Sequence, residues 1–534
     1  MDFTIKGKTF HIWSWKRIIY TLCFFMFCLI DQRTKTGSGL EGYIETFRNM
    51  TGSIMAVILL SHCKWGEIKS HKLPYLLWTI LGGAAGIAYV VGVTSFDPFV
   101  NGRVSAALAV FLTGYALIHT VIRVAIEKKY PAFDKKFLAV WGVMMLLMIF
   151  SRSDYIWPLC YFVMFGCFYL TDYTAEERED LFQGCLNGII LGFFVFQAYC
   201  CVFRPYDEIR YKGIYNNSNI AVTFYLVVLG AVFSKILYVT KEKKHKAWRV
   251  FYWLGAGVLY AFIFMSIGRT GWVVSFIMGL VFLAVYCRFT GKKIFIKSGI
   301  LLILCATLML PVTYGLVRYL PPLFHHPVWF WGEWSEEKVH SWDPWNSYKY
   351  TEFDQLLEES LGRVTEITNR VAEANVFVLR VKAAEPEKDQ RWENAVFKTA
   401  EIDPVVVRKT IYSYYFHNLN LMGHPSSEQG FQLSPYFWVG HAHNIYLQYA
   451  TDFGVPMAVC FIVLNGWAII VLIKRIVKNK SILAVGVLFM MMVPLLFGML
   501  EYAWGTGSIT VILLFTAWRE AMNRSGDNSI GKEG

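Results

Sequence analysis

The sequence predicts an all-α integral membrane protein that crosses the bilayer many times. Hydrophobic residues make up 55% of the 534 residues, charged residues make up only 17%, and the mean hydropathy is +0.41. A water-soluble enzyme of this length would carry more charge. Apolar runs close to the roughly 20 residues that cross a bilayer recur along the chain and are separated by polar segments.

Reading the apolar runs in order predicts up to fourteen transmembrane helices. They lie near residues 18–30, 50–63, 73–93, 104–125, 137–150, 155–170, 181–203, 219–239, 250–267, 271–289, 297–316, 443–473, 482–498 and 503–518. Several runs are short for a span, so the predicted number is 12–14. The chain then divides into a transmembrane bundle (1–316), one large, mostly helical loop domain (317–442), C-terminal transmembrane helices (443–519) and a tail (520–534).

The basic residues predict the orientation of these spans. Most Lys and Arg residues fall in alternate loops, such as the loops around Lys128, Lys243 and Lys474. Such loops stay in the cytoplasm. We therefore expect both termini to be cytoplasmic and the loop 317–442 to be extracytoplasmic. The first run follows basic residues without a small-residue cleavage site, so we expect an uncleaved first helix.

Several functional classes are disfavoured by the same sequence. The net charge is +12, but the positive residues form short clusters between apolar runs, which is typical of topology signals and not of a nucleic-acid surface. The eleven cysteines lie in or beside apolar runs, so neither a disulfide framework nor a thiolate metal site is predicted. A P-loop, a GxGxxG fingerprint and an Asp-x-Asp pair are absent, which argues against a cytoplasmic nucleotide-sugar or ATP site.

The loop 317–442 contains four recognisable parts. Its first part, 321–345, is rich in tryptophan, whose rings either anchor at a membrane interface or stack on sugars. Apolar residues recur at three- and four-residue steps over 351–374 and predict an amphipathic helix. The charged segment 382–393 reads as a solvated turn, and Pro404 precedes another predicted helix, 405–416.

Two groups of arginines are candidates for binding an anion at the outer face. Arg269 lies almost without a loop between two apolar runs, where an arginine requires a partner or a water-filled cavity unless it extends to the lipid headgroups. Arg204, Arg210 and Arg408 lie on the same predicted side of the membrane. Guanidinium groups bind phosphate oxygens in pairs, so convergence of these arginines would bind a diphosphate. An ordinary surface salt bridge is the alternative for Arg408.

His443 and Asn444 lie where the loop meets an apolar helix. A neutral imidazole can take a proton from a sugar hydroxyl, and an amide can orient it, whereas helix capping or packing is the competing interpretation. Further histidines on the same side raise the possibility of zinc. The His441-x-His443 spacing, the absence of cysteine from the loop 317–442 and the absence of HExxH argue against a metal site, and we predict no cofactor.

The order of these motifs resembles the O-antigen ligase and O-antigen polymerase superfamily. The similarity comprises Arg210-x-x-Gly213 with Asn217 and Asn219, then Ser266-Ile267-Gly268-Arg269, then a large outer loop that ends in Gly423-His424 and Ala442-His443-Asn444-x-Tyr446-Leu447 before Asp452-Phe453-Gly454. It covers about residues 205–275 and 405–460. Members of this superfamily are polytopic GT-C-type glycosyltransferases of bacterial cytoplasmic membranes that use undecaprenyl-diphosphate-linked glycans.

The resemblance implies specific roles for individual residues. Arg269 and Arg408 match phosphate-contacting arginines, and His443 matches the catalytic histidine. Arg210, Asn444, His424, Arg204 and Asn217 are then expected to bind substrate. The segment around Arg408 lacks the usual Arg-x-x-x-Trp pattern, so Arg363 is a rival for the same role.

The expected activity is inverting, metal-independent transfer of a glycan at the outer face of the membrane. Arginines would stabilise the departing lipid diphosphate, and His443 would deprotonate the acceptor hydroxyl. The partners are an undecaprenyl-diphosphate-linked oligosaccharide, a glycan or other acceptor, and membrane lipids, with no nucleic acid. A polysaccharide polymerase is the first expectation. The alternatives are ligase-type transfer to lipid A core, protein or a wall polymer, and transport of lipid-linked glycans without chemistry.

Overall fold

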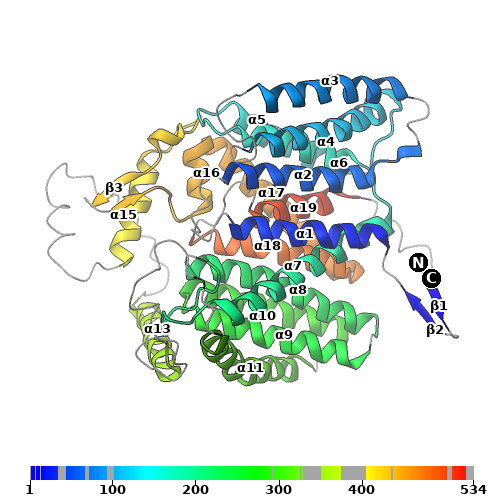
Figure 1. Ribbon diagram of the computed structural model, residues 1–534. Helices are drawn as coiled ribbons and strands as arrows, with labels where there is room; N and C mark the ends of the chain where they lie inside the picture. Colours follow the sequence, from blue (N-terminus) through cyan, green and yellow to red (C-terminus); the bar gives the residue numbers. More distant parts are fainter. Residues whose placement is uncertain are drawn as a thin grey trace.

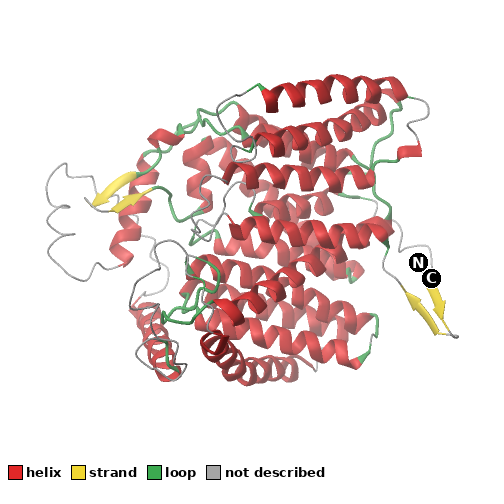
Figure 2. Cartoon of the chain, viewed as in Figure 1, coloured by secondary structure: helices red, strands yellow, loops and turns green. Residues whose placement is uncertain are grey.

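The computed structural model describes residues 2–5, 8–11, 14–33, 44–66, 71–92, 102–215, 217–243, 245–291, 294–324, 328, 350–373, 404–434, 437–501 and 508–524. Helices dominate this part of the chain (Figure 2). Long helices lie side by side in one bundle (Figure 1), in the order α1 (Trp15–Arg33), α2 (Ile44–His62), α3 (Lys72–Val91), α4 (Arg103–Val121), α5 (Lys135–Ile149), α6 (Trp157–Leu170), α7 (Ala175–Phe203), α8 (Ser218–Lys241), α9 (Lys246–Met265), α10 (Arg269–Thr290), α11 (Phe295–Phe324), α17 (Val455–Asn479), α18 (Ile482–Met492) and α19 (Ile509–Met522).

The prediction of an all-α, multi-pass membrane protein is confirmed at this level. Each predicted apolar run contains a helix. Among the described residues, eight helices are long and apolar enough to cross a membrane by length and composition, and Asn49–His62, Trp157–Leu170 and Ile482–Phe497 are shorter apolar helices. The number of spans, predicted as 12–14, and the GT-C-like architecture stay predictions.

Two predicted boundaries differ from the structure. The helix predicted to end at 316 continues to Phe324, past the expected start of the loop domain. The predicted span 443–473 is broken into α16 (Ile445–Phe453) and α17. The break is at Gly454, whose φ of +94° is readily adopted only by glycine, and Pro456 then occupies the first turn of α17.

The loop domain is helical in its described parts but also contains strands. The amphipathic helix predicted over 351–374 is α13 (Phe353–Glu373), and the helix predicted over 405–416 is α15 (Pro404–His417). A hairpin of β3 (Phe431–Ser434) and β4 (Phe437–Val439) was not predicted, nor was the N-terminal hairpin of β1 (Asp2–Ile5) and β2 (Lys8–His11). The tryptophan-rich residues 329–345 and the charged segment 382–393 lie outside the described residues.

The two ends of the bundle carry different segments. The elements α13, α15, α16 and β3 lie at one end, here called the loop end, and the strands β1 and β2 lie at the other, here called the terminal end (Figure 1). At the terminal end, Arg17 pairs with Asp180 and Arg178 pairs with Glu520. All of these residues fall in segments predicted to be cytoplasmic. The alternation of the loops and the membrane side of each end stay predictions.

Helix α8 lies at the centre of the bundle and positions the loop end. It is buried almost all round, with 94% of its most apolar window inside the protein. A helix that is apolar on every face can be buried in this way. It packs against α7, α9, α10 and α18, so its first residues are held at a fixed place at the loop end.

Candidate functional site

A connected polar network at the loop end is centred on Glu501. Its Oε1 atom accepts hydrogen bonds from Arg408 Nη2 at 2.6 Å and from Asn219 Nδ2 at 3.2 Å. Its Oε2 atom lies 3.1 Å from His443 Nδ1. The side chain of Glu501 is only 12% exposed, so these contacts are partly shielded from water. Residues from three separate parts of the sequence thus meet at one carboxylate.

Arg210 extends this network toward the turn between α9 and α10. Its Nη2 atom donates to Asn219 Oδ1 at 2.9 Å, and its Nε atom donates to the carbonyl of Ser266 at 3.3 Å. The next residue, Ile267, has a φ of +49°. Left-handed backbone is strained for a β-branched residue, and such strain often accumulates at functional sites. The turn places Arg269 at the first position of α10.

Four arginines share the electrostatic environment of this network. Burial lowers the pKa of Arg210, and the charges of Arg363 and Arg269 lower it further, while Glu501 and Glu359 oppose this effect. Arg408 joins the same group through Glu501. The four guanidinium groups outnumber the carboxylates of Glu501 and Glu359, so the cluster has a surplus of positive charge. Arg363 and Arg408, considered as rivals from sequence, are therefore both placed near this cluster.

His443 is held in an unusual backbone conformation immediately before α16. Its φ is +49°, whereas Asn444 is extended and caps the helix by accepting a hydrogen bond from the backbone N–H of Leu447 at 3.0 Å. Asn444 also donates to the carbonyl of Met499 at 2.9 Å, which ties the cap to the segment that carries Glu501. The capping interpretation of His443 is therefore wrong, because Asn444 caps α16. The imidazole of His443 contacts Glu501 instead.

The carboxylate and one neighbouring imidazole have shifted pKa values. Burial raises the pKa of Glu501, but the hydrogen bond from His443 and the charge of Arg408 outweigh burial and leave the pKa below its usual value. Burial and the charge of His443 lower the pKa of His441 to about 4, against the opposing effect of Glu501. The rings of the two histidines meet edge to face, with centroids 4.2 Å apart. Glu501 is therefore an anion and His441 is neutral near pH 7.

This geometry supports proton transfer by His443. A carboxylate that accepts the Nδ1–H bond fixes one tautomer of an imidazole and leaves Nε2 able to take a proton. Glu501 also stabilises the imidazolium that results. The same carboxylate holds Arg408, so the imidazole of His443 and the guanidinium group of Arg408 are coupled through one side chain.

Three predicted substrate-binding residues have other contacts. Arg204 is buried and donates to the carbonyls of Gly213 and Val328, at 2.9 and 2.6 Å. Asn217 caps α8 by accepting a hydrogen bond from the backbone N–H of Asn219 at 2.8 Å. His424 lies in a cavity beside α15. Arg204 and Asn217 therefore shape the segment that carries Arg210, and the structure does not join them or His424 to Glu501 by a contact that we describe.

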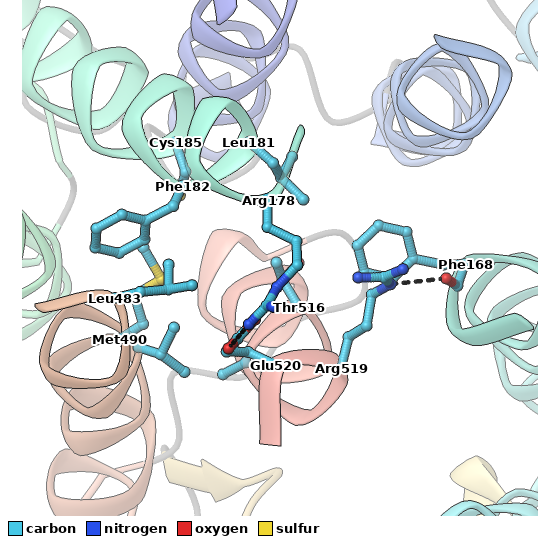
Figure 3. Close-up of a pocket in the computed structure, with 12 residues that line it drawn as sticks. Phe168, Arg178, Leu181, Phe182, Cys185, Leu483, Met490, Thr516, Arg519 and Glu520 are labelled. Atoms are coloured by element: carbon cyan, nitrogen blue, oxygen red, sulfur yellow. Dashed lines mark hydrogen bonds and ion pairs between the residues drawn. The ribbon is translucent and has the colours of Figure 1, made fainter. Parts of the chain in front are cut away.

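Neither a metal site nor a second open charged site is seen among the described residues. In these residues no group of three or more His, Cys, Asp and Glu side chains has a geometry that could hold a metal ion, and His325, His326 and His340 lie outside them. At the terminal end, Arg178 faces Glu520 and Arg519 donates to the carbonyl of Phe168 (Figure 3). The cavity there is about 30 Å³, room for roughly one water molecule. These charges join α6, α7 and α19.

Glu501 was not singled out from the sequence, although a signal was present. Glu501 lies in the short gap between the apolar runs 482–498 and 503–518. A charged side chain there requires a partner or a water-filled cavity, as was argued for Arg269. Its contact with Asn219 joins residues far apart in sequence, which no local pattern reveals.

Comparison of the chain with known proteins finds no matching family model, no matching curated protein and no matching solved structure.

Proposed function

We propose that this protein transfers a glycan from undecaprenyl diphosphate to a growing polysaccharide at the outer face of a bacterial cytoplasmic membrane. The observation that carries the proposal is the contact of Glu501 with both His443 and Arg408. A base oriented by a carboxylate and an arginine for the leaving group are the two functions that this inverting transfer requires.

The surroundings favour an anionic leaving group. Helices α8, α10 and α16 begin at Ser218, Arg269 and Ile445, so three helix N-termini lie at the loop end near the arginine cluster. Helix N-termini carry partial positive charge and favour phosphate groups. Together with the surplus of arginines, they would stabilise the departing diphosphate without a bound metal ion.

The proposed step keeps atoms and charges in balance. His443 Nε2 takes the proton of the acceptor hydroxyl, the hydroxyl oxygen forms a bond to the anomeric carbon, and the bond from that carbon to the diphosphate oxygen breaks. The lipid diphosphate leaves with the electron pair of that bond, next to Arg408, Arg210 and Arg269. The anomeric configuration inverts because the oxygen attacks from the face opposite the leaving group.

The test is incubation of purified protein with a lipid-diphosphate oligosaccharide in the presence of EDTA, followed by analysis of product length. Longer glycan chains support the polymerase assignment. Arg269→Ala and His443→Ala should each abolish elongation, and Arg269→Lys should also fail because an ammonium group lacks the paired donors of a guanidinium group. Normal chains from both alanine variants would reject the catalytic assignment.

The same assay separates the alternative functions. Transfer that occurs only after addition of a lipid A core, a protein or a wall polymer would indicate a ligase. Movement of the lipid-linked glycan across the membrane of lipid vesicles, without formation of a new glycosidic bond, would indicate a transporter. In that case His443→Ala would not be expected to change the covalent structure of any product.

A further inference from the structure

Two buried hydrogen bonds link the interior of α16 to the residue directly before His443. The backbone N–H of Ala442 donates to Gln448 Oε1 at 2.6 Å, and Gln448 Nε2 donates to Asp452 Oδ1 at 2.7 Å. Ala442 is fully buried, and Gln448 and Asp452 are each only 2% exposed. This pair of hydrogen bonds, here called the Gln448 bridge, is therefore shielded from water.

The geometry of a helix explains how the Gln448 bridge forms. Gln448 lies in the first turn of α16, and side chains on a helix tilt toward its N-terminus. Gln448 therefore reaches back past the start of the helix to Ala442. Asp452 follows four residues later, so it lies on the same face as Gln448. A buried backbone N–H requires a partner, and for Ala442 this side chain supplies it.

Asp452 determines which way the amide of Gln448 points. An amide has a donor end and an acceptor end, whereas a carboxylate only accepts hydrogen bonds. Asp452 therefore binds the NH₂ group of Gln448, and the amide oxygen is left to face the N–H of Ala442. With the amide reversed, two donors would face each other at Ala442 and two acceptors at Asp452. The carboxylate thus sets the direction of the whole bridge.

The Gln448 bridge fixes one side of an uncommon backbone conformation. His443 has a φ of +49°, and a residue in this region persists only where its surroundings determine it. On the far side of His443, the N–H of Ile445 donates to the carbonyl of Gly498 at 2.7 Å. On the near side, the bridge holds Ala442. The backbone of His443 is therefore held from both directions while its imidazole lies 3.1 Å from Glu501.

We propose that Gln448 and Asp452 are positioning residues for His443. By holding Ala442, they keep the backbone of His443 in the conformation that places its imidazole against Glu501. They act through the backbone and do not have to touch the substrate. The consequence for catalysis rests on the proposed function, because a displaced imidazole changes the rate only if His443 is the base.

The test measures which nitrogen of His443 carries the proton. The full-length protein with ¹⁵N-labelled histidine is placed in lipid vesicles and studied by solid-state NMR at alkaline pH, where imidazole rings are neutral. The signal of His443 is the one lost in His443→Ala. In the wild type the proton should be on Nδ1, because Glu501 accepts a hydrogen bond there. Gln448→Met removes the bridge with a side chain of similar length and should raise the Nε2–H fraction severalfold.

Further variants separate positioning from a general loss of structure. Asp452→Leu should also raise the Nε2–H fraction, whereas Asp452→Asn should retain the wild-type tautomer because its amide oxygen can accept the same bond. Gln448→Asn, one methylene shorter, is the milder test if Gln448→Met does not fold. The control is Asn465→Leu in α17, which removes another buried amide, one that accepts from Trp518 at 3.0 Å. It should lower the melting temperature and leave the tautomer unchanged.

Three results would overturn the proposal. The first is a wild-type tautomer in the folded Gln448 variants. The second is a change in Asp452→Asn as large as that in Asp452→Leu. The third is an equal change in Asn465→Leu, which would show that any loss of a buried amide moves the imidazole.

The NMR measurement can fail independently of the transferase proposal. In the elongation assay, Gln448→Met should lower kcat roughly tenfold to hundredfold while KM for the lipid-diphosphate donor stays within about twofold, because the arginines remain. Elongation by the wild type with an unchanged tautomer in Gln448→Met would reject the positioning role and retain the function. A changed tautomer in a protein whose wild type never elongates would retain the positioning role and reject the polymerase.

Discussion

The Nδ1 atom of His443 lies 3.1 Å from Oε2 of Glu501, although 58 positions separate the two residues in the sequence. The other oxygen of the same carboxylate binds Arg408 at 2.6 Å. One buried anion therefore orients an imidazole and a guanidinium group at the same time. Because His443 and Arg408 are both held by Glu501, we expect removal of any one of these three side chains to disturb the positions of the other two.

Replacement of Glu501 by Gln should lower the rate of transfer by about 10²–10⁴-fold. An amide cannot stabilise the imidazolium of His443, and its N–H₂ group opposes the donors of Arg408. The measurement is the initial rate of glycan elongation with a fixed lipid-diphosphate donor. Glu208→Gln, at an exposed carboxylate that pairs with Lys212 on the same end of the chain, should retain the rate. Equal rates for all three proteins would remove Glu501 from the mechanism.

Replacement of Asn219 by Ala should reduce kcat/KM by roughly tenfold, because two hydrogen bonds that join Arg210 to Glu501 are lost. If the network acts as a unit, the Asn219→Ala and Glu501→Gln effects will not add in the double variant. Additive losses, measured as kcat/KM for each single variant and for the pair, would indicate that the residues act independently.

The thermal stability of the protein in detergent should rise with pH between about 4 and 6.5. His441 has a folded pKa of about 4, below the usual unfolded value near 6.5, so the unfolded chain binds more protons across this window. The contribution is fully present above pH 6.5 and lost as the pH falls toward 4, with a size of up to about 3 kcal/mol. His441→Asn should flatten the dependence, whereas His417→Asn, at an exposed histidine, should leave it intact.

Replacement of Gly454 by Ala should destabilise the protein by roughly 2 kcal/mol or more. The residue has a φ of +94°, and an added Cβ would lie 2.2 Å from the carbonyl oxygen of Leu421. The matched control is Gly466→Ala, inside α17, where an added Cβ meets no atom within 4 Å. That variant should be neutral or slightly more stable, because alanine favours helix. Thermal unfolding of the two variants in detergent measures the difference, and equal melting temperatures would contradict it.

Local patterns in the sequence were sufficient to predict the positions of the helices. The apolar runs were found because a helix that crosses a bilayer must bury its backbone polar groups in an apolar segment of nearly fixed length. Helix α13 was found because its apolar residues recur with the period of a helix, and α15 was found because Pro404 marks a helix start. The break at Gly454 was missed because the apolar run continues on both sides of it, and only the close approach of Leu421 requires the turn.

The sequence by itself determined the class of protein, the order of its helices and most of the residues that meet at the loop end, including Arg210, Arg408 and His443. Only the tertiary structure decided that Glu501 joins them and that Arg204, Asn217 and His424 have other contacts. The physical reason is that hydrophobic periodicity is a local property of a chain. A hydrogen-bonded site depends on which helix ends the folded bundle brings within about 3 Å of one another.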